Sequence, residues 1–201
     1  CKKCNNPNVS KIEKKFFRTA HIIYPIRDMH RWMGMQIPAY KDRPYITLIG
    51  NEYMKGLPIL LGIAARMEDL SFLVVGRNIT TSYTEKNITY MPWTSQIEDV
   101  YKQTRILLVP SICAESSPGV ALEAQALGIP VVASNQGGIP EILFDTRCLI
   151  DDIWNIDAWV DRLSTIERQP SEYGQVPKEY LMRFHAETQV HAFQTILDTV
   201  V

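Results

Sequence analysis

The sequence lacks several features that define common classes of protein. Its 201 residues carry a net charge of −1 and no basic run, which excludes the clustered positive charge that non-specific nucleic-acid binding requires. No apolar stretch approaches the roughly 20 residues of a membrane span, and no signal peptide is visible. We therefore expect no nucleic-acid partner, no transmembrane segment, and a location in the cytoplasm or peripheral to the inner face of the membrane.

Cysteine is also scarce, and its distribution argues against a metal centre. Four cysteines occur. Cys1 and Cys4 form a single C-x-x-C, without the second pair or nearby histidines that a four-ligand zinc site needs. Cys113 and Cys148 lie beside apolar stretches, and we expect them to be buried thiols. Walker A and GxGxxG loops are absent as well. The sequence therefore predicts no metal and no cofactor.

What the chain does have is an alternation of apolar strands and helices. Hydrophobic residues make up 46% of the sequence, enough for one globular domain over residues 1–201. The strand-like runs are continuously apolar, as in parallel strands covered on both faces. Short links join them to helical segments. We predict an α/β fold with a doubly wound, mostly parallel, Rossmann-like sheet. Trp154, Trp159 and Leu163 recur at helical spacing and indicate packing positions.

The predicted elements divide the domain into three parts. Residues 1–42 hold an N-terminal helix, strand and loop, residues 43–150 hold the core of the sheet, and residues 151–201 hold C-terminal helices. Strands are expected at 21–25, 46–50, 71–76, 87–91, 105–110, 130–134 and 148–150, helices at 8–18, 57–67, 95–104, 118–127 and 138–143, and an ordered loop at 26–44.

The most informative stretch is residues 109–141, VPSICAESSPGVALEAQALGIPVVASNQGGIPE, which reads as strand, loop, helix, strand, loop and helix start. Ser117 suits the N-cap of the first helix, and Pro118 suits its first position. Gly119 and Val120 then offer free N–H groups at the positive end of the helix. Such a helix start is a ready site for an anion.

Two carboxylates flank this helix start. Glu115 ends a loop that follows a strand, where ligands bind in open α/β sheets; the alternative is a solvated loop residue. Glu123 lies about 9 Å along the helix, at about 1.5 Å per residue. Its apolar surroundings require a partner, either an ion pair within the fold or a ligand. An anion site between two carboxylates that can accept hydrogen bonds from hydroxyl groups suits a sugar joined to a nucleotide through a diphosphate.

The stretch from Glu115 to Glu123 resembles the E-x7-E motif of retaining glycosyltransferases of family 4, which have the GT-B fold. The segments 122–143, 46–56, 72–76 and 87–93 are similar to the strands and loops around the donor site in that family. The resemblance covers roughly residues 20–200. It implies that the chain is the C-terminal, donor-binding half of a GT-B enzyme and that the N-terminal acceptor domain is absent from it.

The resemblance also implies roles for individual residues. Lys55 would contact the donor diphosphate and stabilise the leaving group. Glu115 would contact the sugar near the anomeric carbon, and Glu123 would accept hydrogen bonds from the ribose hydroxyls. Further donor-binding residues are expected at Asn51, Pro92, Ser117, Gly119 and Val120. Family members commonly carry arginine where this chain has Asn51, which supplies no charge. Either Arg77 or another basic residue supplies the missing positive charge, or the donor is bound more weakly.

The expected reaction is transfer of a sugar from a UDP- or GDP-sugar, with retention of configuration, to a glycan, lipid or small-molecule acceptor held by the missing domain. The isolated chain is expected to bind the donor without transferring it. Two alternatives stay open. Asn51 suggests a non-catalytic nucleotide-sugar-binding or interaction module. A nucleotide-sugar 2-epimerase-like isomerase would share the architecture, but is not expected to show E-x7-E in this context.

Overall fold

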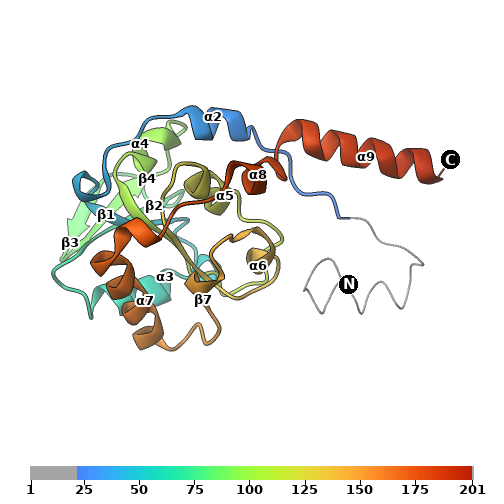
Figure 1. Cartoon of the computed structure of the whole chain (residues 1–201). Helices are drawn as coiled ribbons and strands as arrows, with labels where there is room; N and C mark the ends of the chain where they lie inside the picture. Colours follow the sequence, from blue (N-terminus) through green and yellow to red (C-terminus); the bar gives the residue numbers. More distant parts are fainter. Residues whose placement is uncertain (1–21, 201) are drawn as a thin grey trace.

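A seven-stranded sheet runs through the centre of the computed structural model, which describes residues 22–200 (Figure 1). The strands are β1 (Tyr45–Ile49), β2 (Ser71–Gly76), β3 (Tyr83–Glu85), β4 (Ile88–Pro92), β5 (Thr104–Val109), β6 (Val131–Ser134) and β7 (Leu149–Ile150). Their order in the sheet is β3-β4-β2-β1-β5-β6-β7. Only the edge pair β3–β4 is antiparallel among these strands. The predicted α/β, mostly parallel sheet is confirmed.

Helices cover both faces of the sheet, as a doubly wound fold requires. The helices are α2 (Met29–Gly34), α3 (Leu57–Ala64), α4 (Ile97–Tyr101), α5 (Gly119–Ala126), α6 (Ile139–Ile142), α7 (Ile156–Arg168), α8 (Lys178–Met182) and α9 (Ala186–Val200). Helices α3 and α7 pack together on one face, and α2, α4, α5 and α8 lie on the other (Figure 1). The central strands β1, β2, β5 and β6 are almost entirely buried between these layers, which explains their continuous apolar runs, whereas the edge strand β3 is exposed.

The N-terminal part differs from the sequence prediction. The expected helix at 8–18 and Cys1 and Cys4 lie outside the described residues. Residues 22–25 form no strand; instead the Tyr24 N–H donates to the Gln189 Oε1 of α9 at 2.7 Å. The expected loop contains α2, because the Asp28 side chain caps that helix by accepting from an N–H of its first turn. The β-branched residues at 22–25 thus form no strand, because no strand of the sheet lies next to them.

One strand was missed by the sequence prediction, and two expectations about burial were wrong. Strand β3 was not predicted; it pairs with β4 through a turn at Lys86, whose φ is 53°. Trp154 is 53% exposed, although Trp159 and Leu163 are fully buried as predicted. Cys113 is only partly buried.

Cys148 is buried as expected, and burial, with a smaller contribution from a nearby aspartate, raises the pKa of its thiol to about 12.

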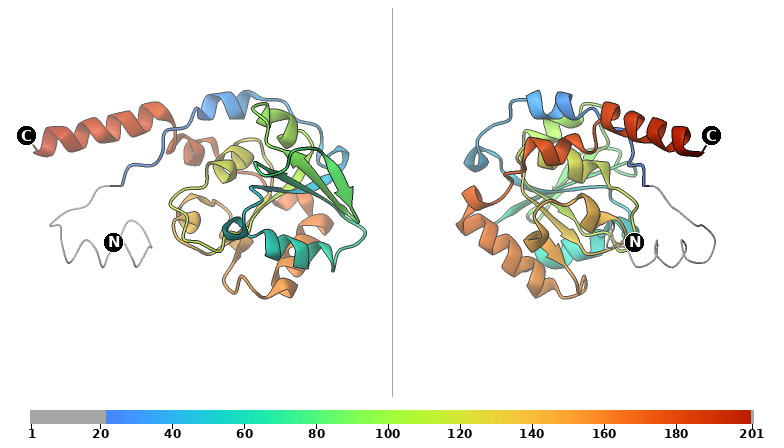
Figure 2. Two further views of the ribbon diagram at one scale, coloured as in Figure 1. Left: turned by 180° about the vertical axis from the view of Figure 1, so that it is seen from behind. Right: turned by 45° about the vertical axis from the view of Figure 1, so that its right-hand side comes forward.

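Helix α9 projects from the body of the domain, as the views in Figure 2 show. Val190, Phe193 and Leu197 are about half exposed along it. Within residues 22–200, no helix combines the length and apolar character that crossing a membrane demands.

Asn87 connects the β3–β4 hairpin to the end of α3. Its Nδ2 lies within 3.0–3.1 Å of three carbonyl oxygens, those of Ala64, Met67 and Leu70. An amide nitrogen has two hydrogens, so at least one of them is shared. Ala64 is the last residue of α3, whereas Met67 and Leu70 lie in the connection from α3 to β2, so one side chain ties this whole connection to the hairpin.

We expect Asn87→Ala to lower the free energy of unfolding by about 1–3 kcal/mol, because the carbonyls of Ala64, Met67 and Leu70 lose their common donor. Asn87→Asp should cost at least as much, since a carboxylate cannot donate. Urea unfolding measures both. Asn78→Ala is the control, because Asn78 is exposed and should change stability by less than about 0.5 kcal/mol. Equal stability of all three variants would contradict this role of Asn87.

Candidate functional site

A cavity of about 370 Å³ opens at the carboxyl ends of β1, β2, β4 and β5. The chain leaves β1 toward β2 on one side and leaves β5 toward β6 on the other. The cavity therefore lies at the topological switch point, where doubly wound sheets bind ligands. Its polar and aromatic lining consists of Glu52, Lys55, Arg77, Trp93, Ser111, Glu115 and Ser117, with Gly119 and Val120 at the start of α5.

Lys55 and Glu115 meet in this cavity. The Lys55 Nζ lies 2.9 Å from the Glu115 Oε2, and the Ser111 hydroxyl donates to the other carboxylate oxygen. Lys55 ends a 3-10 turn and is followed by Gly56, whose φ is 90°. A Cβ on Gly56 would stand 2.6 Å from the carbonyl carbon of Pro110. Glycine therefore allows the Lys55 loop to lie directly against the end of β5.

The backbone around Glu115 is held by Ser134 at the end of β6 and by the glycines that follow it. The Gly138 N–H donates to the Glu115 carbonyl at 2.6 Å. A Cβ on Gly137 would stand 2.7 Å from the Glu115 nitrogen, so the two loops touch. The Ser134 hydroxyl donates to the Ser111 carbonyl at 2.8 Å. These contacts fix the loop before α5 and with it the direction of the Glu115 side chain.

Helix α5 begins one residue later than predicted. Its N-cap is Pro118, with a φ of −67° and a ψ of 108°, and no side chain caps it. The Ser117 hydroxyl is buried and has no hydrogen-bond partner among residues 22–200. The first N–H groups of a helix lack intrahelical partners. Since Gly119 and Val120 line the cavity, the positive end of α5 faces the space beside Lys55.

Glu123 has a partner that the sequence analysis missed. The Tyr101 hydroxyl donates to the Glu123 Oε2 at 2.7 Å. Burial raises the pKa of the Tyr101 phenol well above its ordinary value, and the Glu123 charge raises it further, whereas the charge of Arg27 acts in the opposite direction. Tyr101 therefore stays protonated and donates. Its ring packs edge-on against Trp32, with 5.4 Å between the centroids.

The structure brings together five of the eight predicted site residues. Lys55, Glu115, Ser117, Gly119 and Val120 line one cavity. Asn51, Pro92 and Glu123 do not line it.

Asn51, Pro92 and Glu123 lie elsewhere in the fold. Asn51 packs against Gly76: a Cβ built on Gly76 would lie 2.5 Å from the Asn51 Cβ. The Asn51 Oδ1 is buried and has no hydrogen-bond partner among the described residues. Pro92 ends β4 and pairs with Gly76. Glu123 lies farther along α5.

Two further side chains line the cavity beyond β2 and β4. The guanidinium carbon of Arg77 lies 5.1 Å from the Trp93 ring centroid, and Trp93 is 45% exposed. A flat aromatic face beside a cation suits stacking of a planar ring.

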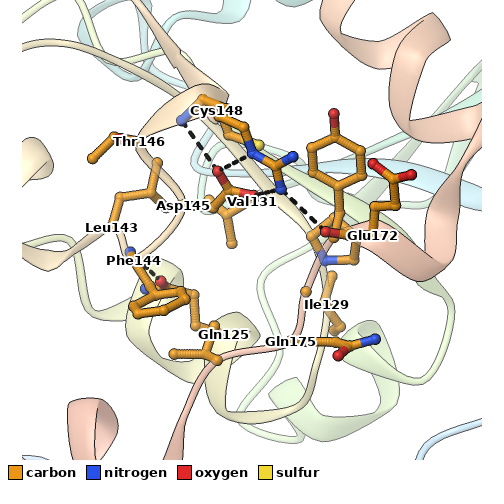
Figure 3. A pocket seen from close by; sticks show the side chains of 15 residues that line it. Gln125, Ile129, Val131, Leu143, Phe144, Asp145, Thr146, Cys148, Glu172 and Gln175 are labelled. Carbon is orange, nitrogen blue, oxygen red and sulfur yellow. Dashed lines mark hydrogen bonds and ion pairs between the residues drawn. The ribbon is translucent and has the colours of Figure 1, made fainter.

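Figure 3 shows another pocket, of about 460 Å³, beside the amino ends of β6 and β7. None of the predicted site residues lines it. Its cation is already engaged: the Arg147 Nη2 lies 2.7 Å from the Asp145 carboxylate and donates to the Glu172 carbonyl at 3.2 Å. The Arg147 guanidinium also lies 4.7 Å from the Tyr173 ring centroid. The cavity at the switch point is therefore the better candidate for an anionic ligand.

The fold defines a doubly wound, Rossmann-like domain with a cavity at its switch point that is lined by Lys55 and the start of α5. Residues 43–168 match the family model described as glycosyl transferases group 1, so the chain belongs to that family. The D-inositol 3-phosphate glycosyltransferase of Mycolicibacterium smegmatis is 28% identical over 163 residues, which are 71% of this chain and 37% of that protein. The enzyme of the same name from Mycobacterium sp. (strain KMS) is 32% identical over 160 residues, 69% of this chain and 36% of that protein. The chain thus spans little more than a third of these relatives.

Solved structures show the same fold at low sequence identity. The lipopolysaccharide outer core galactosyltransferase WaaB, in its apo form, aligns with a TM-score of 0.75 at 16% identity, over 99% of this chain and 61% of that one. Anabaena Alr3699/HepE, in complex with UDP and glucose, aligns with a TM-score of 0.65 at 15% identity, over 90% of this chain and 56% of that one. The predicted GT-B glycosyltransferase fold is confirmed.

We expect Tyr101→Phe to lower the free energy of unfolding by about 1–2 kcal/mol, because a half-buried carboxylate oxygen of Glu123 loses its donor. The ring and its contact with Trp32 are kept. Urea unfolding checks this against Tyr83→Phe, since Tyr83 is exposed and its ring stacks on Tyr90. If the two variants unfold at the same urea concentration, the Tyr101–Glu123 hydrogen bond contributes nothing to stability.

Proposed function

We propose that this chain is the donor-binding domain of a retaining glycosyltransferase of family 4. As part of a longer protein, it would transfer a sugar from a nucleotide diphosphate sugar to an acceptor. The observation that carries the proposal is the convergence of Lys55 and the open end of α5 on one cavity beside Glu115. Membership of the family supports transferase chemistry, and the UDP and glucose held by HepE support a nucleotide sugar as the donor.

The diphosphate is proposed to lie between Lys55 and the first turn of α5. The N–H groups of Gly119 and Val120 would hold one phosphate oxygen, and the Ser117 hydroxyl would donate to another. Lys55 and the helix dipole supply positive charge at this point. On this proposal neither a metal nor a cofactor is needed to neutralise the leaving diphosphate.

Glu115 would serve the reacting sugar. In the free protein its carboxylate holds Lys55. A bound diphosphate would draw the ammonium toward phosphate oxygens and leave Glu115 to accept from sugar hydroxyls near the anomeric carbon. Positive charge grows at that carbon as the bond to the diphosphate breaks, while negative charge grows on the leaving group. Glu115 and Lys55 stabilise these opposite charges, which is the kind of interaction that raises the chemical rate.

The nucleoside is proposed to extend toward Trp93 and Arg77, where its base can stack. Glu123, Asn51 and Pro92 lie outside the cavity lining, so a contact of Glu123 with the ribose and a place for the base near Pro92 rest on the family resemblance. UDP- and GDP-sugars are the proposed donors. A glycan, lipid or small-molecule acceptor would be held by another part of the full-length protein, in the cytoplasm or at the inner face of the membrane.

A non-catalytic binding module is the second candidate, and the position of Asn51 favours it. The side chain is turned against Gly76 and brings no charge to the phosphate site. Such a module would bind the donor, but the full-length protein would neither hydrolyse nor transfer the sugar.

We expect Lys55→Ala to weaken binding of UDP to the 201-residue chain by about 1.5–3 kcal/mol, the usual cost of losing a hydrogen bond between charged groups. Binding of uridine, which has no phosphate, should be unchanged. Calorimetry measures both, with Lys102→Ala as the control, because Lys102 pairs with Asp99 on the exposed side of α4. If Lys55→Ala leaves the affinity for UDP unchanged, Lys55 does not hold the diphosphate.

Glu115→Gln should have opposite effects on binding and on turnover. The neutral side chain releases Lys55 and removes a negative charge beside the diphosphate, so UDP should bind more tightly, by about 1 kcal/mol. Transfer by the full-length protein should fall by about 100-fold or more, because the developing charge at the sugar loses its partner. Glu85→Gln, on the exposed β3, is the matched control. Unchanged transfer in Glu115→Gln would remove Glu115 from the reaction.

A further inference from the structure

Arg27 lies against the first residue of α5. Its backbone is fixed by a parallel bridge to His185 and by a hydrogen bond from the Ala186 N–H to its carbonyl at 3.1 Å. Its guanidinium reaches Gly119. A Cβ built on Gly119 would stand 2.7 Å from the Arg27 Cζ and 2.9 Å from the Nε. Any side chain at position 119 would therefore displace the guanidinium.

This position is electrostatically unusual. The beginning of a helix carries partial positive charge and normally attracts acidic side chains. Here an arginine stands beside it. The Arg27 Nε is buried and has no hydrogen-bond partner among residues 22–200. The hydroxyl of Ser117, two residues before Gly119, is also buried and has no hydrogen-bond partner in that part of the chain.

The two carboxylates that flank the start of α5 have other partners. Glu115 is held by Lys55 and Ser111, and Glu123 accepts from Tyr101. No ion pair of Arg27 occurs among the residues that the structure describes. A cation next to a helix start, with a buried unpaired donor, is costly unless an anion completes the arrangement.

We propose that Arg27 is a second cation for the diphosphate of the donor, contributed by the segment before the sheet, whereas Lys55 comes from the loop after β1. This inference rests on the proposed function. A guanidinium can donate two parallel hydrogen bonds to a phosphate, which an ammonium cannot. Arg27 would thereby supply the charge that Asn51 lacks.

Arg77 itself lines the cavity, whereas Arg27 adjoins it through Gly119, and the surroundings of the two arginines differ. Its guanidinium lies over the Trp93 ring, at the end of the cavity formed by β2 and β4. The contact with Gly119 and the buried unpartnered Nε belong to Arg27. These two observations assign the phosphate at the tip of α5 to Arg27, with Arg77 left beside the stacking surface.

The test is a double-mutant cycle on Arg27 and Gly119 in the 201-residue chain, read by calorimetry with UDP and with uridine. Arg27→Gln should weaken UDP binding roughly ten- to hundredfold and leave uridine binding unchanged. Gly119→Ala should also weaken UDP binding, because the new methyl group pushes the guanidinium away. In the Arg27→Gln background, Gly119→Ala should have little further effect, since the two changes remove the same interaction.

Two additional variants make the outcome specific. Arg27→Lys keeps the charge without the planar fork and should bind UDP with an intermediate affinity. Arg31→Gln is the matched control, because Arg31 is exposed, lies four residues away and pairs with Glu98; it should bind UDP like the unchanged chain. Thermal unfolding of every variant confirms that the fold is retained.

Three results would overturn the inference. UDP affinity could be the same with and without Arg27, the loss could be equal for UDP and uridine, or Gly119→Ala could act equally in both backgrounds. In each case the unchanged chain still binds UDP, so the proposed function stands. Failure of the unchanged chain to bind any nucleotide diphosphate is a different outcome, and it contradicts the proposed function itself.

Discussion

The parallel pairing of β1 with β5 is the contact on which the site depends. The pairing joins Ile46 to Ile106 and Leu48 to Leu108 in the most buried part of the sheet. Because the strands run in the same direction, the loops that follow them leave the sheet at the same edge. Lys55 and Glu115 are 60 residues apart in sequence and nevertheless form an ion pair. The chain turns in opposite directions after these two strands, and this opens the cavity between the loops.

The charges around the cavity are balanced only in part without a ligand. Lys55 is paired with Glu115, whereas Arg27 forms no ion pair and no side chain caps the start of α5 among the described residues. A diphosphate would complete both arrangements at once, because it can take Lys55 from Glu115 and also fill the space at the helix start. In the free protein the Glu115 carboxylate would then be paired with Lys55, and binding of the donor would free it to contact the sugar.

The sequence predicted the strands and the motif loop well, because both depend on local pattern. Continuous apolar runs identified β1, β2, β4, β5 and β6, and Ser117–Pro118 placed the start of α5 to within one residue. Side chains whose place depends on distant partners could not be predicted. Asn51 turns against Gly76, Glu123 meets Tyr101, and Arg27 reaches Gly119 across more than ninety residues of sequence. Trp154 follows the helical spacing of a packing residue but lies before α7, at the surface.

The most direct test of the central claim is the backbone N–H resonance of Gly119 and of Val120 during titration with UDP. If the diphosphate binds at the tip of α5, both resonances should move strongly with UDP and much less with uridine, because N–H groups that donate to phosphate are deshielded. Resonances of residues 143–148, around the pocket at the other edge of the sheet, should stay in place. Movement confined to residues 143–148, with Gly119 and Val120 unchanged, would contradict the account.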